Sequence, residues 1–193
     1  MPRRARVGVA SAAALCAFAA PASGQGPVPT PIGVGPRFHP GPTSRVVARA
    51  QPAGRFACGA RVRTLVRAHI EVFARRRVVI VPAGIGVAPP LVRETGFVRR
   101  GRCSYPVRTL EPTGVVEFDG RLRPTLGELF TLWGQSLSGT RLLSFSGSVH
   151  AYVGGRRWRG SPRGIALRRH AQIVLEVGGY VPPHRSYLFG PGR

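Results

Sequence analysis

The chain has 193 residues, and its 29 basic residues outnumber seven acidic ones, which gives a formal net charge of +22. Every basic residue is an arginine, because the sequence contains no lysine, and it contains no asparagine either. These absences exclude a lysine Schiff base, a P-loop lysine, a lysine–asparagine crosslink and an N-linked glycan.

Residues 1–24 have the pattern of a secretory signal peptide. Three arginines stand among the first six residues, 7–20 is an apolar run of mostly small residues, and Ala20-Pro21-Ala22 offers a small-residue cleavage site. The run is shorter than the roughly 20 residues of a membrane helix, and no later segment reaches that length. We therefore expect an exported protein without a transmembrane span in the mature chain. An uncleaved signal anchor and a lipoprotein attached at Cys16 are the alternatives.

Residues 25–56 are dense in proline and glycine and contain few large apolar side chains. Such a stretch buries too little surface to offset its ordering entropy, so the sequence predicts a disordered linker. A single α+β domain is expected over 57–182, followed by a flexible tail over 183–193.

Two cysteines, Cys58 and Cys103, remain once the signal peptide is removed. Outside the cytosol such a pair usually forms a disulfide, which here would close a loop of about 45 residues and contribute about 4 kcal/mol. Metal binding by two isolated cysteines is the alternative.

The first strands are predicted over Val62–Phe73, which partly alternates apolar and polar residues, and over Val78–Val81, which is β-branched. Arg75-Arg76-Arg77 lies between them, so the two strands are expected to form a hairpin with a basic tip. Val115–Phe118 is a further short strand between turn residues.

One helix is clearly marked. Thr125 and Glu128 have the spacing of a capping box, and Gly134 provides a stop. Four apolar residues then recur at i, i+3, i+4 and i+7 and share one face: Leu126, Leu129, Phe130 and Trp133. We expect this face to be core.

A second hairpin is predicted from Val149–Val153 through two glycines to Arg156–Arg159, and Ile173–Val177 is the last strand. Pro162–Leu167 echoes Pro82–Val87, which leaves duplication and simple structural similarity open. Together these elements predict an α+β fold with a mostly antiparallel sheet of hairpins and one amphipathic helix, β-grasp-like in topology.

A surface this basic attracts anionic polymers such as wall polymers, lipid headgroups or nucleic acid in a salt-dependent way. The alternatives are a solvated surface without a partner and an arginine content that reflects GC-rich coding. We expect anionic cell-envelope polymers as partners and no specific nucleic acid. The two hairpins supply the candidate anion-binding residues: Arg75, Arg76, Arg77, Arg156 and Arg157.

The sequence carries no G-x-S-x-G elbow, no Walker loop, no G-x-G-x-x-G and no local metal-ligand spacing among its five histidines. We therefore expect a non-enzymatic protein that needs no cofactor.

From Cys58 to Val177 the chain resembles an uncharacterised family of exported bacterial proteins, common in actinobacteria. Its members carry an H-x-H-x-H strand, a V-P-x-G-I-G-I turn, C-x-Y followed by H-x-H and G-I-I-H, a T-L-G-x-x-F-x-x-W-G-Q-x-L segment and a closing P-R-x-I-P-L. The matching residues here are His69-Ile70, Val81–Pro90, Cys103, Tyr105, Gly114-Val115-Val116, Thr125-Leu126-Gly127, Phe130, Trp133-Gly134-Gln135, Leu137, Pro162-Arg163 and His170.

The resemblance implies a histidine cluster on one sheet face that binds copper or zinc. This chain departs from it, with Arg67 and Arg108 at family histidine positions and Glu117 at another. His69, Glu117 and His170 remain as candidate ligands, although fixed positive charge at the neighbouring positions should repel a cation. We expect an exported cell-envelope binding or structural module. A metal-binding protein with a degenerate cluster and an arginine-rich binder of anionic polymers are the alternatives.

Overall fold

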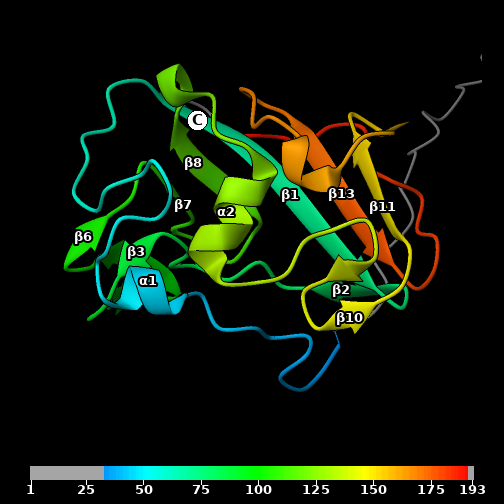
Figure 1. The fold of residues 1–193 in the computed structure, drawn as a ribbon, viewed down its shortest axis with the longest axis horizontal. Coiled ribbons are helices and arrows are strands. Elements are labelled where there is room, and N and C mark those ends of the chain that lie inside the picture. Colours follow the sequence, from blue (N-terminus) through cyan, green and yellow to red (C-terminus); the bar gives the residue numbers. More distant parts are fainter. Residues whose placement is uncertain (1–32, 191–193) are drawn as a thin grey trace, which may run out of the picture.

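The computed structural model describes residues 33–190, so the predicted signal peptide lies outside the described residues. A seven-stranded sheet forms its centre, in the order β12-β11-β13-β1-β8-β7, with β2 paired to β1 (Figure 1). Its strands are β1 (Leu65–Ala74), β2 (Arg77–Val79), β7 (Val107–Arg108), β8 (Val115–Asp119), β11 (Val149–Val153), β12 (Arg156–Arg157) and β13 (Gln172–Val177). In residues 33–190 we find no helix with the length and apolarity needed to cross a bilayer.

The two longest strands, β1 and β13, lie side by side and parallel at the centre, in register from His69 opposite Gln172 to Ala74 opposite Val177. The other pairs of this sheet are antiparallel, including both predicted hairpins, β1–β2 and β11–β12. β13 separates those hairpins, so they are not neighbours in the sheet. The α+β prediction is confirmed, with the first and last long strands parallel under one main helix.

Helix α2 (Leu126–Trp133) packs across one face of the sheet. The Oγ1 of Thr125 accepts a hydrogen bond from the backbone N–H of Glu128 at 3.3 Å, and a carboxylate oxygen of Glu128 accepts one from Thr125 N–H at 2.8 Å. Each side chain thus satisfies an unpaired backbone donor at the helix start. Gly134 ends the helix with a φ of 73°, a conformation that glycine adopts without steric cost. The predicted helix and its caps are confirmed.

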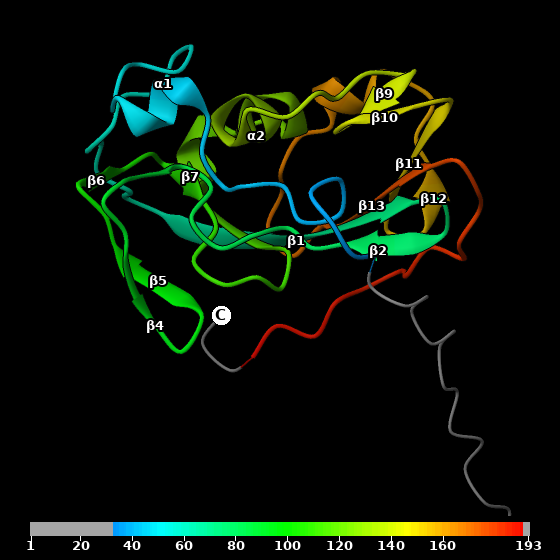
Figure 2. The ribbon, with the colours of Figure 1, turned by 90° about the horizontal axis from the view of Figure 1, so that it is seen from below.

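Smaller elements surround the sheet. On the side of α2 lie α1 (Arg45–Ala48) and the β9–β10 hairpin (Arg141–Leu142 and Phe145–Ser146), while the β4–β5 hairpin (Val92–Glu94 and Phe97–Arg100) lies on the other side (Figure 2). The remaining elements are β3 (Val87–Ala88), β6 (Cys103–Ser104) and the 3₁₀ turns η1 (Gly120–Leu122) and η2 (Pro162–Gly164).

Cys58 and Cys103 form a disulfide that closes a loop with a sequence separation of 45 residues. It joins the segment before β1 to β6, which itself pairs with β3. The predicted pairing is therefore confirmed, and metal binding by these two thiols is ruled out in this state.

Residues 33–56, which fall within the predicted linker, make contacts with the rest of the domain. Val47 of α1 is fully buried, and Phe38 lies against Phe145 with a ring-centroid distance of 5.4 Å. The carbonyl of Gly41 accepts a hydrogen bond from Trp133 Nε1 at 2.9 Å, and that of Gln51 accepts one from the Tyr105 hydroxyl. The few apolar side chains and the carbonyl groups of this segment therefore contribute to the burial of aromatic residues elsewhere in the chain.

The last described residues, which include part of the predicted tail, also contact the sheet. Residues 180–190 cross the sheet face opposite α2 (Figure 2). Val181 N–H donates to Glu176 at 3.2 Å, His184 Nδ1 lies 2.9 Å from the carboxylate of Glu71, and Tyr187 stacks on His69. We call residues 180–190 the C-terminal strap. Its order comes from polar and aromatic contacts, which a hydrophobicity pattern does not show.

Trp133→Ala is expected to lower the free energy of unfolding by about 3–5 kcal/mol, because it leaves a cavity in the core and an unpaired Gly41 carbonyl. Trp133→Phe keeps an aromatic ring and should lose less. Trp158→Ala is the matched control, since that tryptophan is 39% exposed and should change stability by less than about 1 kcal/mol. Urea unfolding followed by far-UV circular dichroism measures all three. Parental stability of the Trp133→Ala protein would contradict this account of the core.

Candidate functional site

His69 lies on β1 and faces the C-terminal strap, because side chains alternate along a strand and those of Ile70 and Val72 enter the core. Its Nδ1 is 2.7 Å from the side-chain oxygen of Gln172, and its Nε2 is 2.8 Å from the carbonyl of Thr113. Tyr187 covers the ring at a centroid distance of 3.7 Å. Both ring nitrogens lie within hydrogen-bond distance of oxygen atoms, so a metal ion at either nitrogen would have to displace Gln172 or Thr113.

Glu117, the second candidate ligand, lies opposite Arg67 in the β1–β8 pairing and opposite Arg108 in the β7–β8 pairing. Arg67 Nη2 is 2.6 Å from Oε1, and Arg108 Nη2 is 3.2 Å from Oε2. Both carboxylate oxygens therefore bind guanidinium groups. Arg67, Glu117 and Arg108 thus form one group of ion pairs. These are the positions that carry histidines in the family to which the sequence motifs show a resemblance.

His170 lies just before β13, and its exposed ring stacks on Phe189 at 4.7 Å. It does not join His69 and Glu117 in a common site. Among residues 33–190, no group of three or more histidine, cysteine, aspartate or glutamate side chains is arranged to hold a metal ion.

A cavity of about 610 Å³ lies between β1, β2, the turn at 112–114 and the C-terminal strap. Its lining is mostly aliphatic, and its titratable side chains include those of His69, Glu71 and His184. Glu71 is held by His184, and His69 is held as described above. These polar groups fasten the C-terminal strap to the sheet.

The predicted anion-binding arginines fall into two separate places. Arg75, Arg76 and Arg77 form the exposed tip of the β1–β2 hairpin, where Arg75 lies over the Phe145 ring at 5.9 Å. Arg156 and Arg157 form the edge strand β12, next to the end of β13 away from that tip. The structure does not bring the two groups into one site.

Four other arginines do meet around one hollow of about 590 Å³, which we call the arginine hollow. Arg121 and Arg123 come from η1 and its C-cap, and Arg168 and Arg169 come from the segment before β13. Thr64 lies at the rim, and the rest of the lining is apolar or backbone: Val66, Phe118, Gly120, Ala166 and Leu167. No acidic residue lines it.

The backbone holds these two segments together. Leu167 N–H donates to the carbonyl of Pro124 at 2.8 Å, and Leu126 N–H donates to that of Ile165 at 2.8 Å. Gly120 N–H donates to Thr64 at 2.9 Å, which fixes η1 to the start of β1. The arginine pairs are therefore carried on a connected frame, so a bound anion would not have to order the backbone.

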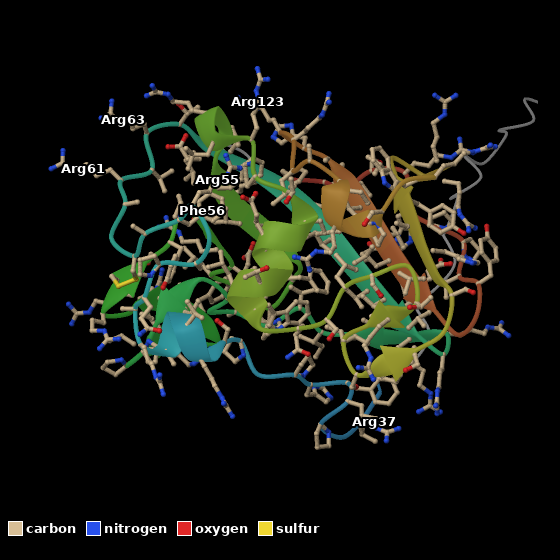
Figure 3. The ribbon with its side chains drawn as sticks, in the orientation of Figure 1. Arg37, Arg55, Phe56, Arg61, Arg63 and Arg123 are labelled. Atoms are coloured by element: carbon tan, nitrogen blue, oxygen red, sulfur yellow. A yellow bond between two sulfur atoms is a disulfide. The ribbon has the colours of Figure 1, made fainter. Side chains whose placement is uncertain are left out.

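A second hollow of about 430 Å³ adjoins the first and shares Arg121 with it. Its other arginines are Arg55, Arg61 and Arg63, and Figure 3 shows Arg61 and Arg63 pointing outwards at one end of the molecule, with Arg123 on the adjoining upper edge. The carboxylate in this hollow belongs to Asp119, which is buried and accepts the backbone N–H groups of Arg63 and Arg121. The N–H of Arg63 is the main cause that lowers the pKa of Asp119. The Asp119 carboxylate therefore fixes the backbone at Arg63 and Arg121.

The ion pairs of the described residues form away from the arginine hollow, and Asp119 lies close enough to Arg121 for their charges to interact. Glu117 pairs with two arginines, Glu128 with Arg55 and Glu94 with Arg99. Glu71 binds His184. Of the ion pairs in residues 33–190, none includes Arg121, Arg123, Arg168 or Arg169.

Sequence reasoning missed the arginine hollow. Its two arginine pairs look like every other arginine pair in the chain, and they are separated by more than forty residues. Their meeting depends on the antiparallel bridge between Thr125 and Ala166, which no local pattern predicts.

Comparisons with protein-family models, with curated proteins and with solved structures found no match for this chain.

Glu176 shows the largest effect of burial on an acid in the described structure. It lies on β13 beneath the C-terminal strap, and burial raises its pKa from 4.5 to about 7, although Val181 N–H, Arg157 and Tyr152 act in the opposite direction. Its Oε2 is buried without a hydrogen-bond partner in the structure. The protonated form is thus favoured in the folded state.

The free energy of unfolding should therefore fall as pH rises from about 4.5 to about 7, by at most about 3 kcal/mol from this group. Across that range the unfolded chain has lost the proton and the folded chain still holds it. Glu176→Gln should remove this component of the slope, whereas Glu94→Gln, at an exposed position, should keep it. Urea unfolding at several pH values measures the slopes. Equal slopes for the parent and Glu176→Gln would contradict the assignment.

Proposed function

We propose that this chain is an exported, non-enzymatic binding module of the cell envelope that holds anionic polymers through the arginine hollow. Export is supported by the signal-peptide pattern of residues 1–24 and by the disulfide, which is typical of proteins outside the cytosol. The observation that carries the proposal is a rigidly framed hollow with four guanidinium groups and no acidic side chain.

The hollow suits repeated negative charge. Guanidinium groups bind phosphate or carboxylate oxygens through two parallel hydrogen bonds, and they keep their charge at all relevant pH values. The neighbouring hollow adds Arg61 and Arg63 at the same end of the molecule, so an extended anion can continue past Arg121. Binding of this kind does not require the protein to catalyse a reaction of the ligand.

The metal-binding alternative has weaker support. Both ring nitrogens of His69 lie within hydrogen-bond distance of protein oxygens, and both carboxylate oxygens of Glu117 pair with arginines, so a metal would have to displace existing partners. A cation placed near Glu117 would also meet the positive charges of Arg67 and Arg108.

The test compares two variants that remove equal charge. Arg121, Arg123, Arg168 and Arg169 are changed to glutamine in one, and four exposed arginines elsewhere in the other: Arg37, Arg45, Arg49 and Arg100. Binding of the full chain to polyphosphate is measured at several salt concentrations. We expect the first variant to bind at least about tenfold more weakly with a shallower salt dependence, and the control to change by less than about threefold.

Equal losses in both variants would show that only the total charge attracts the polymer, which is the solvated-surface alternative.

A third variant, with Arg75, Arg76 and Arg77 changed to glutamine, tests the hairpin tip. We expect a smaller loss there than at the arginine hollow, because that tip lies in none of the hollows described above.

A further inference from the structure

The chain has two tryptophans, and only one of them belongs to the core. Trp133 is 1% exposed, whereas Trp158 is 39% exposed on the segment that follows β12. Trp158 lines a hollow of about 760 Å³ together with Arg157, Arg159 and Ser161, and we call this the tryptophan hollow. The Arg159 side chain shares this hollow, whereas the guanidinium of Arg157 lies over the Tyr152 ring. An exposed indole beside an arginine needs a physical reason, because a tryptophan gains most by burial.

The indole is held in place although it faces water. The backbone N–H of Trp158 donates to the carbonyl of Ala151 at 2.8 Å. The indole Nε1 donates to the carbonyl of Ser161 at 3.1 Å. Gly160 lies so close that a Cβ there would be 3.1 Å from Nε1. The ring therefore loses little further conformational freedom when a ligand stacks on it.

We propose that the tryptophan hollow binds a sugar ring of an acidic polysaccharide. The C–H groups of a pyranose are weakly positive and fit the negative face of an indole, while Arg159 is placed to bind a carboxylate or sulfate on the same polymer. Ser161 and the backbone of Gly139 and Gly160 offer polar groups for hydroxyls. The inference rests on the proposed function and specifies the class of polymer.

The connection between the two hollows favours one extended ligand. Residues 156–169 run from the tryptophan hollow to the arginine hollow and contain six arginines and no acidic residue. Between the hollows this segment lies on the start of α2, where Arg163 Nη2 donates to the carbonyl of Gly127 at 3.4 Å. A polymer that enters at Trp158 thus meets positive charge along the chain as far as Arg169.

A single-stranded nucleic acid is the other ligand that stacks on aromatic rings, but its binding proteins present several rings for successive bases. The tryptophan hollow presents one ring, Trp158. The polar lining and the single ring favour a sugar.

The experiment measures binding of the full chain to polygalacturonate, polyphosphate, neutral dextran and single-stranded DNA. Trp158→Ala is expected to weaken polygalacturonate binding about tenfold, while Trp158→Phe stays within about threefold and polyphosphate binding within about twofold. In a Trp133→Phe background, the fluorescence of Trp158 should change on addition of polygalacturonate and remain unchanged with polyphosphate.

Parental affinity of Trp158→Ala for polygalacturonate, or no binding by the parent, would overturn the proposal, as would an equal loss on polyphosphate. Binding of dextran as tight as that of polygalacturonate would remove the role of charge and also overturn it. A loss confined to single-stranded DNA would assign the ring to bases instead. The proposed function fails separately, if the arginine-hollow variant binds polyphosphate as tightly as its matched control.

Discussion

The parallel pairing of β1 with β13 is the constraint on which the rest of the structure depends. It joins the first and last long strands through six residue pairs and fixes which side chains face each side of the sheet. Ile70 and Val72 enter the core beneath α2, while His69 and Glu71 face the C-terminal strap. A shift of one residue in this register would exchange the two sets and bury charge in the core.

Local patterns were sufficient for the elements that form their own hydrogen bonds. The capping box at Thr125, the spacing of four apolar residues and Gly134 define α2 completely, and Gly154-Gly155 marks the turn of the β11–β12 hairpin. Residues 33–56 and the C-terminal strap were not predictable in this way, because their order comes from partners far away in the sequence. The carbonyl of Gly41 accepts a hydrogen bond from Trp133, and the ring of Tyr187 stacks on that of His69.

The candidate site was predictable only in its chemistry. The excess of arginine pointed to anionic partners, and the disulfide followed from the number of cysteines and the signal-peptide pattern. The place of the site was not predictable, since Arg121 and Arg168 come together only when the segment after η2 pairs with the start of α2. Arg67, Arg108 and Glu117 show the same limit, because their ion pairs require the registers of two strand pairings.

The edge of the sheet at β12 carries a consequence for self-association. An exposed edge strand offers unpaired backbone groups to another chain, and short, charged strands oppose such pairing. β12 has two residues, and both are arginines. A second copy that approached this edge in antiparallel fashion would bring its own arginines against them, so mutual repulsion protects the sheet from growing into an aggregate.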